Sequence, residues 1–155
     1  MTNDEAAILI EMAKRLRKKL LALPDPGAKQ FYKAENLANT KKFIIQVFRG
    51  RMGKSKYNIS LIFRRTLVLL RIDTGYAGVH YNTDNTVIPA NTPHLHYYDE
   101  NIKHENKCHN AMLLPPEFTN PNEAVQLLLD FLQYINIVDM EDIQIVQQGG
   151  LNYDV

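Results

Sequence analysis

The sequence predicts an α+β fold: an N-terminal helix, a twisted antiparallel sheet of about five to seven strands, and a C-terminal helix packed on the sheet. Leucine residues at helical spacing occur near both ends of the chain. Between them, at about residues 30–98, short runs rich in Ile, Val, Phe and Tyr alternate with turn residues, which is typical of strands. A chain of 155 residues that is 45% hydrophobic has the size of one domain, 1–155, with its own core.

The first helix is expected at about residues 4–23. Asn3 or Asp4 can cap its start, and Pro24 begins a turn that ends it. Lys and Arg residues gather at positions 14–19 of this segment. This basic cluster is either a face for RNA or a protein partner, or the solvated side of an amphipathic helix.

Four longer strands and several short ones should follow in antiparallel order, at about 31–36, 42–48, 57–63, 66–72, 79–82, 86–88 and 93–98. Residues 99–119 contain Pro115 and Pro116 and are expected to be an irregular loop. Asn120 as cap and Pro121 as first helical residue predict a helix over about 121–136. The remaining predictions are a last strand at about 143–147 and a loose tail from Gly149.

Charge and composition exclude few functions. The net charge is +1 and the sequence pI is about 7.8, so binding to nucleic acid must depend on local basic patches. One cysteine, Cys108, favours a reducing compartment, and the chain shows neither a signal sequence nor a long apolar run. We therefore expect a cytoplasmic protein without a membrane partner.

Basic residues near two turns of the expected sheet are candidates for binding phosphate or a protein partner. The loop that contains Gly50 and Gly53 ends in Gly-Lys-Ser but lacks the other glycine and the following helix of a nucleotide-binding loop. Its basic side chains can still contact phosphates. The candidates are Arg49, Arg51, Lys54, Arg64 and Arg65.

The segment that begins at Pro93 contains the densest set of groups with chemistry near neutral pH. In an extended segment His94, His96 and Tyr98 share one face. Consecutive antiparallel strands would bring His80 beside the two histidines, and Arg71 ends a neighbouring run. We take these five residues as candidate catalytic residues.

Three hypotheses explain this cluster. Histidine can supply both the acid and the base for metal-independent cleavage of RNA, with Arg71 and Tyr98 contacting the phosphate. Alternatively, the histidines bind a metal ion. In the third hypothesis they only form hydrogen bonds between strands. No cofactor is predicted, and a metal is not favoured.

The segment also resembles the His-x-His-x3-Glu core of the cupin signature. That resemblance implies metal binding by His94, His96 and Glu100. The glycines that flank the cupin signature are absent, because Ile88 and Lys107 stand in their places.

A larger ordered set of residues resembles a second family. The set consists of Arg71-x-Asp73, His80-x-Asn82, Pro93-His94-x-His96-x-Tyr98-x-Glu100, Ala111, Asn120-Pro121 and a Leu-rich helix that ends at Asn136-Ile137. It is similar to a family of small uncharacterised proteins of phages, prophages and other mobile elements of Gram-positive bacteria. The resemblance covers about the middle and C-terminal two thirds of the chain and implies an origin and a cellular context.

Two classes of function follow as hypotheses. One is a phage-related ribonuclease of the kind found in toxin-antitoxin systems, by analogy with small toxins that carry His, Arg and Tyr on a short sheet. The other is a protein without enzymatic activity that binds a phage or host protein. The cupin-like metal site is a third possibility.

Overall fold

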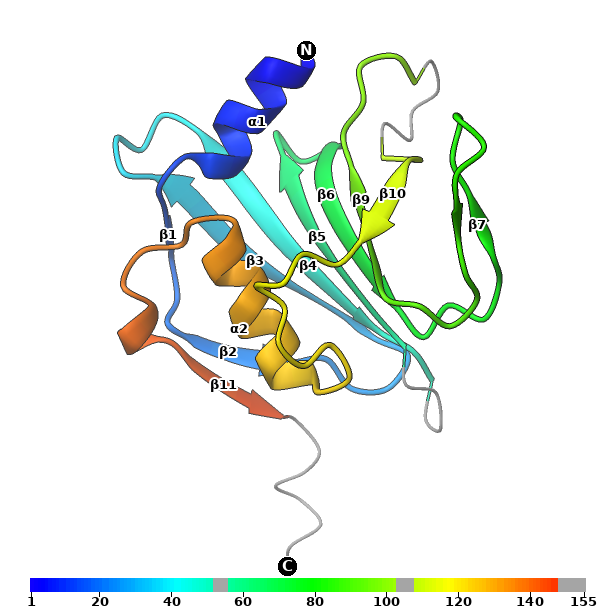
Figure 1. The fold of residues 1–155 in the computed structure, drawn as a ribbon. Coiled ribbons are helices and arrows are strands. Elements are labelled where there is room, and N and C mark those ends of the chain that lie inside the picture. Colours follow the sequence, from blue (N-terminus) through cyan, green and yellow to red (C-terminus); the bar gives the residue numbers. More distant parts are fainter. Residues whose placement is uncertain (52–55, 103–107, 148–155) are drawn as a thin grey trace, which may run out of the picture.

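The computed structural model describes residues 1–51, 56–102 and 108–147 of the chain. Its elements follow one another from the N-terminus in Figure 1. They are α1 (Asn3–Glu11), β1 (Lys14–Leu16), β2 (Leu20–Leu23), β3 (Lys29–Asn36), β4 (Lys42–Arg49), β5 (Tyr57–Phe63), β6 (Leu67–Thr74), β7 (His80–Tyr81), β8 (Val87–Ile88), β9 (His94–Tyr97), β10 (Ala111–Leu113), α2 (Ala124–Tyr134), the 3-10 helix η1 (Met140–Asp142) and β11 (Gln144–Gln147).

The predicted α+β class is confirmed. Seven strands form one sheet in the order β1-β3-β4-β5-β6-β9-β10, and all neighbours in it are antiparallel. Strands β7 and β8 form a separate hairpin, and β2 pairs in parallel with β11. Helix α2 lies across the sheet (Figure 1). The hairpin of β7 and β8 stands beside β10, at the edge of the sheet far from β1.

The two faces of the sheet have different compositions. Residues paired across neighbouring strands share a face, and successive residues alternate between faces. On the core face Phe43, Ile45 and Leu61 are fully buried and belong to one apolar cluster with Leu127 and Phe131 of α2. The other face, here called the outer face, carries mostly polar residues: Phe31, Lys33, Ile44, Gln46, Phe48, Asn58, Ser60, Arg71, Asp73, His94 and His96.

The prediction of one helix over residues 4–23 is wrong. Thr2 caps α1 through a capping box with Glu5, and the helix already ends at Glu11. Lys14 then begins β1, and its ammonium donates hydrogen bonds of 2.7 to 2.8 Å to the carbonyls of Ile10, Met12 and Ile135. The buried lysine thus caps the end of α1 and ties it to α2, which the leucine spacing alone does not reveal.

Two later boundaries also differ from the predictions. Glu123, rather than Asn120, caps α2, because its carboxylate accepts hydrogen bonds from the backbone N–H groups of Val125 and Gln126. The expected loop over 99–119 contains the short edge strand β10, which continues the sheet beyond β9. The predicted tail lies outside the described residues.

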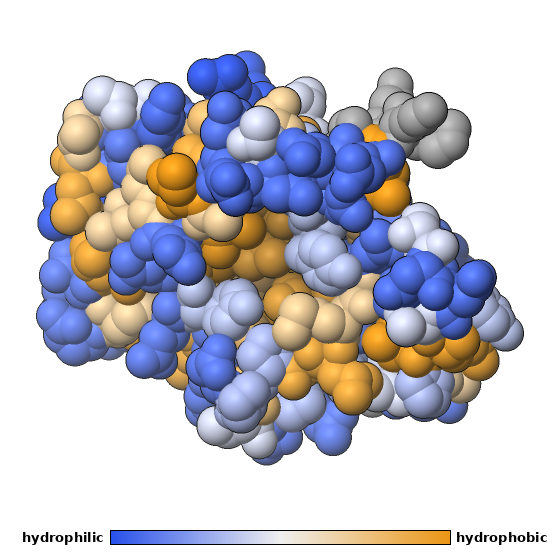
Figure 2. All heavy atoms as spheres, turned by 45° about the horizontal axis from the view of Figure 1, so that its top comes forward, coloured by the Kyte–Doolittle hydropathy of each residue, from blue (hydrophilic) through white to orange (hydrophobic). Residues whose placement is uncertain are grey.

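Apolar side chains reach the surface in several separate places between hydrophilic ones (Figure 2). None of the helices in the described part of the chain is long and apolar enough to cross a membrane.

Candidate functional site

Two neighbouring strands place four polar side chains together on the outer face. In the pairing of β6 with β9, Arg71 lies opposite His96 and Asp73 lies opposite His94. The alternation of the two strands directs these four residues to one side, while Ile72 and Leu95 enter the core. His94 and His96 are buried at this position.

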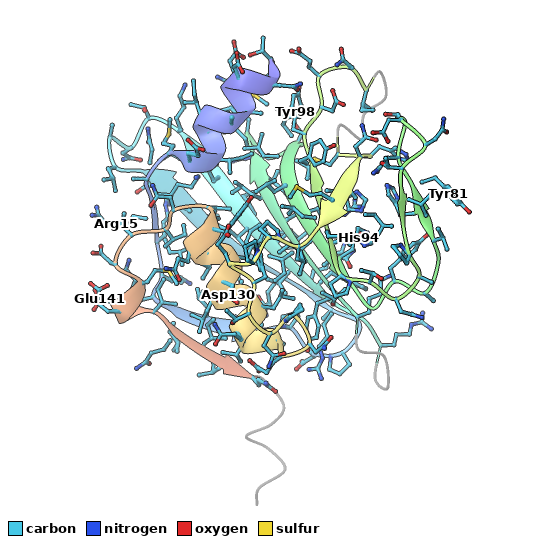
Figure 3. The ribbon with its side chains drawn as sticks, in the orientation of Figure 1. Arg15, Tyr81, His94, Tyr98, Asp130 and Glu141 are labelled. Carbon is cyan, nitrogen blue, oxygen red and sulfur yellow. The ribbon has the colours of Figure 1, made fainter. Side chains whose placement is uncertain are left out.

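A third histidine comes from the hairpin. His80 pairs with Ile88, which is buried, whereas Tyr81 on the other side of the hairpin is exposed and points away from the molecule (Figure 3). The ring centroid of His80 lies 4.9 Å from that of His96 and 5.7 Å from that of His94. The expected meeting of His80 with the other two histidines is therefore present, although the hairpin is not part of the main sheet.

Side-chain amides hold the hairpin against the edge strand β10. The Asn82 amide donates to the carbonyl of Ala111 and accepts from its N–H, each at 2.8 Å. One residue earlier, the amide oxygen of Asn110 accepts hydrogen bonds from the backbone and hydroxyl of Thr83. His80 is thus positioned by hydrogen bonds of its neighbours along the chain.

Backbone carbonyls determine how the buried histidines are protonated. Nδ1 of His94 lies 2.8 Å from the carbonyl oxygen of Thr92, and Nδ1 of His96 lies 3.0 Å from that of His109. Because a carbonyl oxygen only accepts, each Nδ1 carries a hydrogen and donates it. In the neutral rings both Nε2 atoms then carry a lone pair.

These lone pairs converge with a carboxylate. The two Nε2 atoms are 3.1 Å apart, and Oδ2 of Asp73 lies 3.0 Å from Nε2 of His96 and 3.6 Å from that of His94. The guanidinium of Arg71 donates to both oxygens of Asp73, at 3.1 and 3.2 Å. Three acceptor atoms around one point require a cation between them, either a shared proton or a metal ion.

The charges in the cluster shift its pKa values. Burial opposes ionisation of Asp73, but hydrogen bonds from His94 and His96 and the charge of Arg71 hold its pKa far below the usual range. Burial also opposes protonation of His94, yet the bonds to Asp73 and to the Thr92 carbonyl together raise its pKa. Burial, followed by the positive charge of His96, lowers the pKa of His80.

A pocket of about 230 Å³ gives access to this cluster. Nε2 of His80 is buried there and has no hydrogen-bond partner among the described residues. Tyr76 packs edge-on to His94, with ring centroids 6.1 Å apart. The lining consists of Arg71, Asp73, Tyr76, His80, His94, His96 and His109.

Other candidate residues lie elsewhere. The hydroxyl of Tyr98 donates to the carbonyl of Met1, near α1 and away from His94 (Figure 3). The carboxylate of Glu100 accepts from the N–H of Asn3, so Glu100 does not join the histidines as the cupin-like ligand set requires. The place of a carboxylate beside the two imidazoles is taken by Asp73.

The basic candidates are also absent from the lining of the histidine pocket in the described part of the chain. Arg49 donates to the carbonyl of Pro24, Arg51 is exposed, and Arg64 lies over the ring of Phe63. Arg65 lines a different pocket, beside β3 and β4. Lys54 lies outside the described residues.

Three residues that line the histidine pocket, Asp73, Tyr76 and His109, were not among the candidates predicted from the sequence. Asp73 follows Arg71 by two residues and shares its strand face, a spacing that could have indicated its role. Tyr76 lies in the loop that follows β6, and no pattern in the sequence identifies it. His109 lies two residues before the first residue of β10, and its Nε2 donates to the carbonyl of Tyr81.

A comparison with known proteins places the chain in a family but gives no activity. No curated protein and no solved structure matches it. A family model matches residues 1–137, which include every residue of the histidine pocket. The chain therefore belongs to a family of unknown function, DUF6978.

Proposed function

We propose that His94, His96 and Asp73 bind one divalent transition-metal ion and that the protein uses this ion to hydrolyse phosphodiester bonds. The proposal depends chiefly on one observation, the convergence of two Nε2 lone pairs and a carboxylate oxygen on one point. An ion with imidazole and carboxylate ligands is zinc, iron or manganese in many protein sites.

The distances between the donor atoms suit a tetrahedral ion. Bonds of about 2.05 Å from a central ion place neighbouring ligand atoms about 3.3 Å apart. The corresponding separations here are 3.0, 3.1 and 3.6 Å. The same short separation leaves no room for a phosphate group between His94 and His96, which disfavours this pair as the acid and base on opposite sides of a phosphorus atom.

The surroundings of the three ligands also suit a metal. Histidines that bind metals usually donate their other ring N–H to a carbonyl or carboxylate, and both histidines do so here. Arg71 holds the Asp73 carboxylate in a fixed orientation with two hydrogen bonds. The cluster is therefore organised before any ion binds.

Asp73, His94 and His96 would hold the ion and leave a position open for water, and the bound ion would lower the pKa of that water. In hydrolysis the water oxygen bonds to phosphorus, and the bond from phosphorus to the leaving oxygen breaks. His80, whose Nε2 has no partner in the described structure, can carry the proton of the water to the leaving oxygen. Arg71 supplies a positive charge for the phosphate.

Metal analysis of protein purified without a histidine tag tests this function. We expect about one ion per chain in the wild type, loss of the ion in His94→Ala and Asp73→Asn, and retention in His80→Ala. The His80→Ala variant is the matched control, because it removes an imidazole from the same pocket without removing a ligand. Folded wild-type protein that takes up no zinc, iron or manganese after dialysis against each would refute the proposal.

Metal-independent cleavage of RNA, the mechanism expected from the sequence, is a second candidate. It is favoured by the presence of His80 and Arg71 beside a histidine pair that can share one proton. Cleavage of RNA that persists after removal of all metal by a chelator would favour this mechanism, and cleavage that returns only with added metal would exclude it.

The other expectations from the sequence stay predictions. They are a phage or mobile-element origin, a toxin-type role, a cytoplasmic location and, as the alternative to an enzyme, binding of a phage or host protein. Toxicity of the expressed protein that disappears in folded His96→Ala would favour an enzymatic role over protein binding alone.

A further inference from the structure

Two adjoining pockets lie beside β1 and β3, toward the other edge of the sheet from the histidines. Their volumes are about 430 and 220 Å³. Arg17 and Lys33 line both pockets, so the two form one depression, here called the basic groove. Its charged side chains are Arg17, Lys18, Lys33, Lys42 and Arg65.

The charge of the basic groove differs from that of the whole protein. The described linings of the two pockets contain five basic side chains and no acidic one, whereas the chain as a whole has a net charge of +1. Glu35 lies beside the groove and forms ion pairs with Arg17 and Lys42, which leaves Lys18, Lys33 and Arg65 without an ion pair in the described structure. The groove is therefore a local site for an anion.

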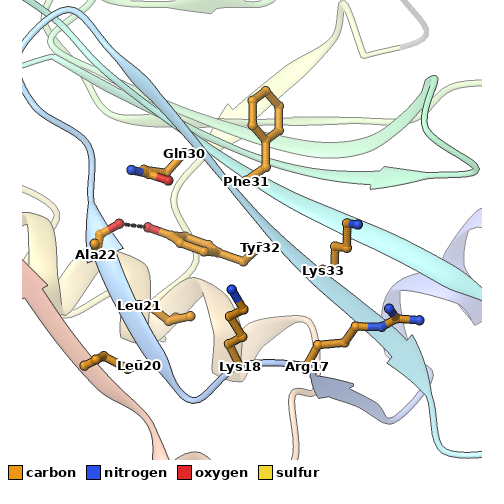
Figure 4. Close-up of a pocket in the computed structure, with 9 residues that line it drawn as sticks. All are labelled: Arg17, Lys18, Leu20, Leu21, Ala22, Gln30, Phe31, Tyr32 and Lys33. Atoms are coloured by element: carbon orange, nitrogen blue, oxygen red, sulfur yellow. Dashed lines mark hydrogen bonds between the residues drawn. The ribbon is translucent and has the colours of Figure 1, made fainter.

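An exposed aromatic ring accompanies these charges. Phe31 lines the larger pocket, and 58% of its surface is exposed although it lies within a strand of the sheet. Figure 4 shows Phe31 and Lys33 projecting from one side of β3, whereas the Tyr32 ring projects from the other side, toward Ala22. An aromatic ring beside cations is the combination that binds the bases and phosphates of single strands.

A row of polar residues joins the basic groove to the histidine pocket. The pairing of neighbouring strands aligns Phe31 with Gln46, Gln46 with Ser60, Ser60 with Arg71, and Arg71 with His96. The row crosses four strand spacings, a distance of about 19 Å. All its members belong to the outer face, opposite α2.

We propose that the outer face binds single-stranded nucleic acid, with phosphates on the basic groove, a base on Phe31, and the following nucleotides directed along this row to the histidine pocket. The inference depends on the proposed function, because it names the substrate class of that site. A duplex hides the faces of its bases and would leave Phe31 unused. An acidic protein would use the cations but has no comparable need for the stacking surface.

Binding of a labelled single-stranded RNA of about 12 nucleotides, followed by fluorescence anisotropy, tests the inference. The measurement is made in the presence of a chelator, which separates binding from metal-dependent cleavage. The double variant Lys33→Ala/Arg65→Ala should bind at least about tenfold more weakly than the wild type. The magnitude of the negative slope of log K against log salt should decrease by about 1.4, because two phosphate contacts are lost. Phe31→Ala should lose about tenfold.

Arg64 and Arg65 provide a matched pair of single variants. They are adjacent and exposed, and both have positive φ, at 53° and 70°, so alanine strains the backbone similarly at each. Only Arg65 lines the groove, so only Arg65→Ala should weaken binding. Equal affinities of the two variants for the RNA would overturn the inference. Polyglutamate that displaces the RNA as effectively as unlabelled RNA does would also overturn it, and would indicate an acidic protein as the partner.

Discussion

Replacing Asn82 by alanine tests whether the hairpin is held by its side chain. The change removes both hydrogen bonds to the backbone of Ala111, each 2.8 Å long, and one bond to the exposed hydroxyl of Thr86. Ala111 is only 4% exposed, so its N–H and carbonyl lose partners that water replaces poorly. At about 1 kcal/mol or somewhat more for each lost bond, the free energy of unfolding should fall by about 2–3 kcal/mol.

Urea denaturation measures this loss. With an m-value of about 2 kcal/mol/M, the midpoint should fall by about 1 to 1.5 M. Thr86→Val is the control, because it breaks only exposed hydrogen bonds and should change stability by less than about 0.5 kcal/mol. If Asn82→Ala is no less stable than Thr86→Val, the two hydrogen bonds between Asn82 and Ala111 do not stabilise the fold.

Three further predictions concern residues outside the site. Burial lowers the pKa of Lys14 to about 7, so between pH 7 and about 10 the unfolded chain binds a proton at Lys14 that the folded chain does not. The free energy of unfolding of the wild type, relative to that of Lys14→Met, should therefore rise with pH by up to about 1.4 kcal/mol per pH unit, which urea titrations at several pH values measure. A difference that does not change with pH would show that Lys14 stays charged in the fold. Tyr98→Phe should leave the metal content unchanged and lower the free energy of unfolding by about 1 kcal/mol, since its hydroxyl bonds only to Met1 in the described structure; loss of metal would contradict this. Burial raises the pKa of the Cys108 thiol to about 12, so thiol reagents should label it quickly only after unfolding, and fast labelling of native protein would refute its burial.

The longer strands could be predicted because their own residues determine them. Alternating apolar residues in β4 and β5 predict strands within one or two residues of the observed ends. The prediction of the first helix was wrong for the opposite reason. Leu16 lies at helical spacing from Leu9, and both are buried, but Leu16 is in a strand whose partner, β3, is distant in the sequence. Local spacing cannot distinguish these cases when tertiary contacts decide.

The candidate site was predictable in part. The spacing of His94 and His96 indicates a shared strand face, and the convergence with Arg71 follows if the strands are neighbours. Tyr98 was placed with them by the same alternation, but β9 ends at Tyr97, and the alternation does not continue beyond the strand. A pattern of period two predicts faces only as far as the strand extends.

Asn82 and Ala111 illustrate the part that sequence reasoning cannot supply. Both belong to the set of residues that resembles the phage-related family, yet nothing in the spacing of 29 residues indicates contact between them. In the structure they form a two-bond clasp. That two such residues contact each other can be recognised only when the path of the chain is known.

The interruption of the sheet explains why the site lies where it does. Strands β6 and β9 are neighbours although residues 75–93 separate them in the sequence. Those residues leave the sheet, form the hairpin that carries His80, and return so that His94 meets Asp73. The insertion thus supplies the element that covers the site and leads into the ligand strand β9, and a metal bound at Asp73, His94 and His96 would join β6 to β9. We therefore expect metal binding to stabilise the fold as well as to provide chemistry, since an ion that binds only the folded chain raises the free energy of unfolding.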